Sequence, residues 1–146
     1  MNKYTFLKLS DTPTDSQVIF LYELLKIREY SISHKKMPSF QSHKNFVLNN
    51  PYSQWFILKY DEVYVGSLYI NMDNSVGIHF LTEYRHIAIN YLRSFEDRFK
   101  PLKGIPSIRS KFFSFNISPK DNYMAELLIE NGYQVKQVTY QKETNI

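Results

Sequence analysis

Two side chains near the middle of the sequence are of the types that accept protons in enzymes. His79 lies within a β-type run, Val76–Leu81, and Glu83 follows two residues after that run. An imidazole has an unperturbed pKa of about 6.5, so His79 could take a proton from a reacting group directly or through water. Glu83 is the second candidate base. The structural alternatives are a hydrogen-bonded sheet residue for His79 and a solvated loop acid for Glu83.

Metal chemistry is not expected from this sequence. The four histidines, at positions 34, 43, 79 and 86, show no ligand spacing such as the His-Glu-x-x-His pair of zinc enzymes. The sequence has no cysteine, which excludes disulfides, thiolate catalysis and metal sites that need thiolate ligands.

The segment from Arg85 to Lys111 carries an excess of positive charge. It holds seven basic residues against two acidic ones, within a chain whose net charge is +4. Such a cluster suits an anionic partner, either a nucleic acid or a phosphorylated small molecule, and its alternative is a solvated surface. Phe112, Phe113 and Phe115 could stack on bases. Strand alternation instead sends Phe113 and Phe115 to one face, most simply to the core, so a nucleic acid is the least favoured partner.

Length and composition indicate one folded domain. The chain has 146 residues with no visible linker or repeat, so we expect a single domain over residues 1–146. Aromatic residues make up 16% and charged residues 22% of the chain, a composition that excludes disorder. The apolar runs are far shorter than the roughly 20 residues of a membrane span. We therefore expect a soluble, cytoplasmic monomer or homodimer with no membrane partner.

The N-terminal part of the chain predicts a strand followed by two helices. The strand is expected over Tyr4–Leu9. Thr14–Gln17 has the capping-box pattern at the start of a helix that should run to about Tyr30. Ser39 is expected to cap a second, shorter helix that stops before Pro51.

The middle of the chain consists of runs rich in β-forming residues. Trp55–Leu58, Val63–Ile70 and Val76–Leu81 predict three antiparallel strands, with a hairpin turn at Asp61-Glu62. From Arg85 the apolar positions recur at helical spacing.

The C-terminal part predicts a strand, a helix and a last strand. The first strand is expected over Lys111–Ile117, and Ser118 is expected to cap a helix with Pro119 at its first position. This helix should stop at Asn131-Gly132, and Gln134–Gln141 should form the final strand. The order is then β-α-α-β-β-β-α-β-α-β, an α/β fold in which helices cover both faces of a mixed, strongly curved sheet.

This order and the residues that it carries resemble the GCN5-related N-acetyltransferase superfamily. The likeness covers almost the whole chain and is densest in four segments. These segments are residues 28–46, Trp55–Tyr69 with its Val65-Gly66 step, Val76–Phe80, and Asn116–Asn122 followed by Gly132-Tyr133.

The resemblance implies acetyl-CoA as co-substrate. Its pantetheine would pair with the strand around Ile78, His79 and Phe80 like an added strand, with Gly77 allowing close approach. Its pyrophosphate would lie at the start of the following helix, where free N–H groups favour an anion. That helix start comprises Arg85, His86, Ile87, Ala88, Ile89 and Asn90, and Asn116 and Asn122 are expected to add contacts.

Two departures from the family pattern concern the phosphate loop and the catalytic acid. Ala88 and Asn90 stand at the two positions where the family has small residues, so the loop is degenerate. Leu128 stands four residues before Gly132, where many members have a tyrosine that protonates the departing thiolate. Tyr123 is the candidate substitute.

The resemblance implies transfer of an acetyl group from acetyl-CoA to a primary amine of a small molecule, with an amino sugar as one candidate acceptor. Arg28 and His43 are the candidate acceptor-binding residues, with surface ion pairing and structural capping as their alternatives. Backbone N–H groups near Ile78–Phe80 would stabilise the developing oxyanion. Two other hypotheses stay open: a binding protein of the GCN5-related N-acetyltransferase fold without catalysis, and a nucleic-acid-binding module.

Overall fold

The computed structural model describes residues 3–28 and 37–142. Its elements, in chain order, are β1 Tyr4–Lys8, α1 Asp15–Lys26, α2 Phe40–Leu48, β2 Gln54–Tyr60, β3 Val63–Ile70, β4 Ser75–Phe80, the 3-10 helix η1 Thr82–Ile87, α3 Ala88–Arg98, β5 Ser114–Phe115 and α4 Asn122–Glu130. The predicted order is confirmed from the first strand to the last helix. No helix of the described residues is both long and apolar enough to cross a membrane.

The strands form one mixed sheet in the order β1-β2-β3-β4-β5. The first four strands are antiparallel neighbours, and β5 alone runs parallel to β4. The β4–β5 pairing covers only Ser75 with Ser114 and Val76 with Phe115. The predicted mixed sheet is therefore correct, but the strand expected over Lys111–Ile117 shrinks to two residues.

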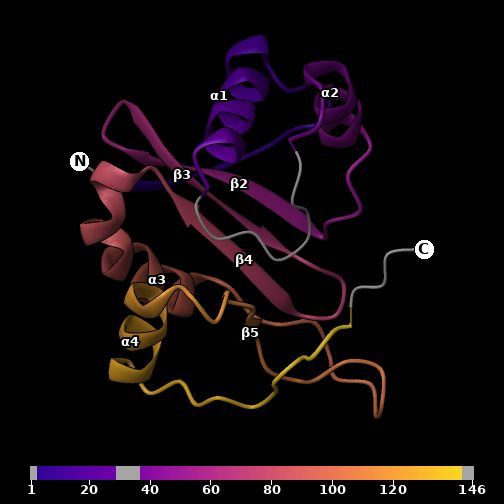
Figure 1. Ribbon diagram of the computed structural model, residues 1–146, viewed down its shortest axis with the longest axis vertical. Coiled ribbons are helices and arrows are strands. Elements are labelled where there is room, and N and C mark those ends of the chain that lie inside the picture. Colours follow the sequence, from indigo (N-terminus) through magenta and orange to yellow (C-terminus); the bar gives the residue numbers. More distant parts are fainter. Residues whose placement is uncertain (1–2, 29–36, 143–146) are drawn as a thin grey trace.

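Helices cover both faces of the sheet, as predicted. Helices α1 and α2 lie on one face and α3 and α4 on the other (Figure 1). The core beneath α1 and α2 is built around Val18, Leu21, Val47, Trp55 and Ile57, which are all buried. The opposite core, beneath α3 and α4, is larger and mostly aliphatic and aromatic; it includes Phe56, Leu68, Ile78, Tyr91, Phe95 and Met124.

The capping box predicted at the start of α1 is present. Thr14 Oγ1 accepts a hydrogen bond from the Gln17 N–H at 3.2 Å, and Gln17 Oε1 accepts one from the Thr14 N–H at 2.9 Å. Ser39 caps α2 as expected, with its hydroxyl accepting from the Ser42 N–H. Helix α1 ends at Lys26, before the expected end at about Tyr30, and Tyr30 itself lies outside the described residues.

Helix α4 begins three residues later than the sequence predicted. Ser118 and Pro119 lie in a turn in which the Asp121 N–H donates to Ser118 O, and Asp121 is the N-cap. The Asp121 carboxylate accepts a hydrogen bond from the Met124 N–H and also forms an ion pair with Arg85. A serine hydroxyl could cap the helix but could not form the ion pair. The stop at Asn131-Gly132 is confirmed, with Gly132 at a φ of +91°.

The final strand predicted over Gln134–Gln141 is wrong. Residues 134–142 contain no strand, and Val135, Val138 and Tyr140 are 75%, 65% and 91% exposed. The alternation of this segment is that of a strand, but β5 offers an edge of only two residues, and a strand is stable only when it is paired.

A buried asparagine ties the β3–β4 turn to the loop that leads to β5. Asn74 is fully buried at a φ of +70°, and its Nδ2 donates to Leu102 O and Ser110 O, each at 2.8 Å. Its Oδ1 accepts from the Leu102 N–H at 2.8 Å. One side chain therefore fixes both ends of residues 102–110 against the sheet, and so sets where β5 begins.

Candidate active site

The edge of β4 is open where β5 ends. The last backbone contact between the two segments is the Asn116 N–H donating to Val76 O at 3.4 Å, and no further pairing follows among the described residues. The Leu81 N–H donates to Val65 O on the β3 side. Because N–H groups alternate along a strand, those of Ile78 and Phe80 point the other way, toward the open edge.

Two adjoining cavities occupy this gap. The larger has a volume of about 190 Å³ and the smaller about 60 Å³, and both are lined by Arg28, Ile78, His79 and Asp121. The larger is also lined by Tyr69, Asn71, Val76, Gly77, Asn116, Ile117 and Ser118. Since its lining comes from β3, β4, the end of α1 and the segment between β5 and α4, tertiary folding alone assembles it.

His79, the candidate base, lies at the junction of the two cavities, and its electrostatics differ from those of an ordinary histidine. Its Nε2 is buried and has no hydrogen-bond partner. Burial, with a smaller effect of the positive charge of Arg28, lowers the pKa of His79 to about 3. The imidazole is therefore neutral at physiological pH.

Arg28 follows directly after α1 and lines both cavities. Its Nε is buried without a hydrogen-bond partner, and burial lowers the pKa of its guanidinium. The surface ion pair that is the alternative role of Arg28 would need a nearby glutamate. Glu23 instead binds Lys26 at 3.3 Å, and Glu29 lies outside the described residues.

The space over Gly77 is filled by protein. Gly77 faces Tyr69 across β3 and β4, and a Cβ built at Gly77 would lie 2.1 Å from Cζ of Tyr69. The Tyr69 ring also stacks on Tyr52 with ring centroids 4.1 Å apart. The glycine thus admits the tyrosine ring on this face, where we expected a ligand. Tyr69 was missed by the sequence analysis, although it lies on the strand that was predicted to pair with the strand of Gly77.

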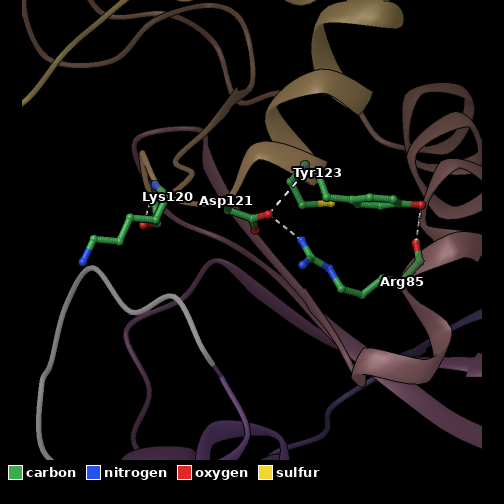
Figure 2. A network of polar contacts seen from close by, with 6 residues as sticks. Arg85, Lys120, Asp121 and Tyr123 are labelled. Atoms are coloured by element: carbon green, nitrogen blue, oxygen red, sulfur yellow. Dashed lines mark hydrogen bonds and ion pairs between the residues drawn. The ribbon is translucent and has the colours of Figure 1, made fainter.

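Arg85 joins the two sides of the gap (Figure 2). Its Nη2 lies 2.5 Å from Asp121 Oδ1, with the two side chains 25% and 14% exposed, so this ion pair is partly buried. The Tyr123 hydroxyl donates to Arg85 O at 3.2 Å, and the Arg85 guanidinium lies 5.0 Å from the centre of the Tyr123 ring. Arg85, expected at the cofactor phosphates, is therefore held by Asp121.

The expected phosphate loop has a different local structure from the one predicted. Residues Thr82–Ile87 form a 3-10 turn that runs directly into α3, and the Ala88 N–H donates to Arg85 O. The side chains of Ile87 and Ala88 are buried in the core, so the Ala88 methyl does not point at a ligand. Asn90 Nδ2 donates weakly to Ile87 O at 3.4 Å. His86 is exposed and Ile89 is half-buried.

Four other predicted site residues lie away from the cavities. His43 is buried between α1 and α2, where its Nε2 lies 3.3 Å from Val18 O, a packing role. Glu83 and Tyr123 are exposed in η1 and α4, and Asn122 is the exposed first residue of α4. Asn116, in contrast, lines the larger cavity. The described residues contain no group of three or more acidic or histidine side chains that could hold a metal ion.

Replacement of Asp121 tests the network across the gap. Asp121→Ala removes the cap of α4 and the partner of Arg85, and should lower the free energy of unfolding by about 1–3 kcal/mol. Asp121→Asn keeps a good cap and should lose clearly less. Urea unfolding of both variants measures this, with Asp97→Ala on the exposed face of α3 as control. Equal losses for the alanine and asparagine variants would show that the cap contributes nothing.

Comparison with known proteins supports the fold assignment. No protein-family model and no curated protein matches this sequence. Among solved structures, the chain is similar to aminoglycoside N-acetyltransferase AAC(6')-Iy in complex with CoA, with a TM-score of 0.58, 13% identity, and 96% of this chain and 94% of the other covered. It is similar to RimL, a ribosomal-protein α-N-acetyltransferase in complex with coenzyme A, with a TM-score of 0.62 and 11% identity over 99% and 87% of the two chains. It is also similar to spermidine N-acetyltransferase from Vibrio cholerae, with a TM-score of 0.58 and 14% identity over 92% and 81%.

Identities this low carry the fold and not the reaction. The likeness extends over nearly the full length of each pair, so it includes β4 and the elements around it. The chain therefore has the fold of the GCN5-related N-acetyltransferases.

Proposed function

We propose that this protein transfers an acetyl group from acetyl-CoA to a primary amine of a small molecule. The observation that carries the proposal is the open edge of β4, where Ile78 lines the cavity of about 190 Å³ and Phe80 lines the adjoining cavity of about 60 Å³. The CoA complexes of two proteins of the same fold support this choice of co-substrate. The cytoplasm, where we expect the protein, would supply acetyl-CoA.

The residues around the gap fit an extended amide chain. A pantetheine arm has amide groups that can pair with a free strand edge, and the Ile78 and Phe80 N–H groups offer donors for it. Asn116, Ile117 and Ser118 form the opposite wall. At the phosphate end the fit is poorer than predicted, because Arg85 is bound to Asp121 and the Ala88 N–H is used within the helix.

The reaction would need the acceptor nitrogen beside the open edge. Acetyl-CoA supplies a thioester whose acetyl carbon bonds to the amine nitrogen as the carbon–sulfur bond breaks, with one proton passing from nitrogen and one reaching sulfur. Of the Ile78 and Phe80 N–H groups, the one that the pantetheine leaves free would stabilise the negative charge that develops on the carbonyl oxygen. With a pKa of about 3, His79 would bind and orient the acceptor as a neutral imidazole rather than hold its proton. The proton would leave through water.

A second candidate is a binding protein of this fold without catalysis. Two observations favour it: the internal use of the Ala88 N–H and the Arg85–Asp121 ion pair. Both reduce the groups that are free to hold a pyrophosphate.

Acetyl-CoA binding separates the two candidates. At about 100 times its dissociation constant a ligand stabilises a protein by about 2.7 kcal/mol, so acetyl-CoA should raise the melting temperature by about 5–10 °C. Asn116→Trp places a large ring in the cavity and should abolish this shift, whereas Gln134→Trp, at an exposed position outside it, should retain it. Release of free CoA with a panel of amines then measures turnover. An unchanged melting temperature at millimolar acetyl-CoA would contradict acetyl transfer and leave the binding protein without catalysis as the remaining candidate.

A further inference from the structure

Arg28, at the junction of the two cavities, is a half-buried cation with no acidic counterion among the described residues. Arg28 lines both cavities and its Nε is buried without a partner. No ion pair joins Arg28 to an acidic side chain in the described parts of the chain. Charges that are taken out of water in proteins are normally paired, so the unpaired Nε of Arg28 is open to a ligand, because the described residues supply no partner for it.

A second unsatisfied group lies at the same junction. His79 Nε2 is buried without a hydrogen bond, and His79 lines both cavities with Arg28. These are the two side-chain atoms among the described residues that are buried and unpaired. Most buried polar groups find a partner, so two exceptions at one cavity point to a ligand that both would contact.

The charge at the junction is positive. Asp121 is the one acidic side chain among the described residues that line the cavities, and its Oδ1 already binds Arg85 Nη2 and the Met124 N–H. Arg28 is therefore the charge left to be balanced. A neutral His79 can add a hydrogen bond from Nε2, in the tautomer that carries its proton there.

We propose that Arg28 and His79 bind a carboxylate of the acceptor, so that the acceptor is a compact amine bearing a carboxylate, of the size of an amino acid. This inference rests on the proposed function and names the substrate class of the same site. A guanidinium and a carboxylate form strong charge-assisted hydrogen bonds, and the neutral imidazole would bind the same group.

Size and charge both favour this class over a polycation. The cavities, of about 190 and 60 Å³, are smaller than the roughly 300–1,000 Å³ of sites for drug-sized ligands, and they must also admit the pantetheine arm, so the space left beside Arg28 and His79 suits a compact acceptor. Tyr69 lines one side of the larger cavity, and the stacking of its ring on Tyr52 restrains it there. A polyamine or an aminoglycoside would place further positive charges against Arg28.

Matched pairs of acceptors test the proposal. The twenty standard L-amino acids and their carboxamides carry the same amine with and without the negative charge. With acetyl-CoA and the full chain, at least one amino acid should exceed its amide in kcat/KM by about tenfold or more, the usual effect of a charge-assisted hydrogen bond. Arg28→Gln should remove that preference. The KM for the amino acid should rise, and the dissociation constant for acetyl-CoA should not change.

Two variants serve as comparisons. Arg28→Lys keeps the charge and should retain part of the preference, which distinguishes carboxylate binding from a general effect on folding. Arg93→Gln makes the same change at an exposed position of α3 outside the cavities and should leave the preference intact. Calorimetry of amino-acid binding to the protein saturated with CoA gives a readout that does not depend on turnover.

The outcomes separate the two proposals. Equal use of amino acids and amides, preference for spermidine, or a preference unchanged in Arg28→Gln would overturn the carboxylate site and leave acetyl transfer standing. If acetyl-CoA does not bind, the proposed function fails, and amino-acid binding to the free protein that is lost in Arg28→Gln would still support the site. No amino-acid binding at millimolar concentration in either state would overturn it.

Discussion

Replacing Asn74 by alanine should lower the free energy of unfolding by about 3–5 kcal/mol, a large fraction of the stability of a domain. The change removes three side-chain hydrogen bonds of 2.8 Å at a fully buried position. It leaves Leu102 N–H, Leu102 O and Ser110 O without partners. It also places a Cβ without compensating hydrogen bonds at a φ of +70°.

Two further substitutions at Asn74 separate these causes. Asn74→Gly loses the same hydrogen bonds but adopts the positive φ freely, so it should be more stable than the alanine variant by about 1 kcal/mol. Asn74→Asp retains the size of the side chain but loses both donors, and its carboxylate would face two carbonyl oxygens, so it should also be strongly destabilised. Urea unfolding measures all three variants. A loss below about 1 kcal/mol in Asn74→Ala would show that the loop does not depend on these bonds.

The stability of the protein should fall as the pH falls from 7 to 5, in large part because of His79. Its pKa is about 3 in the folded state against about 6.5 in an unfolded chain, so the unfolded state binds a proton first as the pH falls. The free energy of unfolding therefore decreases with falling pH between about 6.5 and 3, by up to about 1.4 kcal/mol per pH unit. Between pH 7 and pH 5 the loss due to His79 should be about 2 kcal/mol.

His79→Gln should remove most of this pH dependence. A neutral glutamine has no proton to bind, so the variant and the wild type should differ in slope and not only in stability. Burial also lowers the pKa of His43, which would account for a smaller slope of the same sign in the variant. Urea unfolding at pH 7, 6 and 5 compares the two proteins. Parallel stability curves over this range would contradict a neutral, buried His79.

The same burial revises the expected pH profile of any reaction at this site. An ordinary histidine base would give a rate that rises with pH through a midpoint between about 6 and 8. Since His79 is already unprotonated throughout that range, any such midpoint would belong to another group or to the acceptor amine. Persistence of the midpoint in His79→Gln would agree with this assignment.

The fold could be predicted from the sequence because its signals are local and periodic. The β-rich run Val63–Ile70 gave a strand with those bounds, and the apolar spacing from Ile87 to Phe95 gave the buried face of α3. The capping box at Thr14 needs only residues within one helical turn, so its prediction was correct. The cap of α4 was predicted at Ser118, but Asp121 caps this helix, and its carboxylate also binds Arg85 from a distant part of the sequence.

The candidate site could be predicted only in part, because its chemistry depends on burial. The sequence placed Ile78, His79 and Asn116 at one site, and the cavity contains all three. It did not reveal that His79 Nε2 is unpaired or that Arg85 is held by Asp121. Those properties depend on what surrounds a side chain, which is contributed by segments far away in the sequence.

The sequence by itself therefore determined the order of the elements and the faces that they bury, since both follow from residue spacing within single helices and strands. The tertiary structure alone decided three further features. Asn74 sets the start of β5 through contacts with residues 28 and 36 positions away, and the short β5 leaves Gln134–Gln141 without an edge to pair with. The same short β5 opens the cavity in which Arg28 and His79 meet. Desolvation and unsatisfied hydrogen bonding arise only when distant segments pack together, so no local pattern in the sequence encodes them.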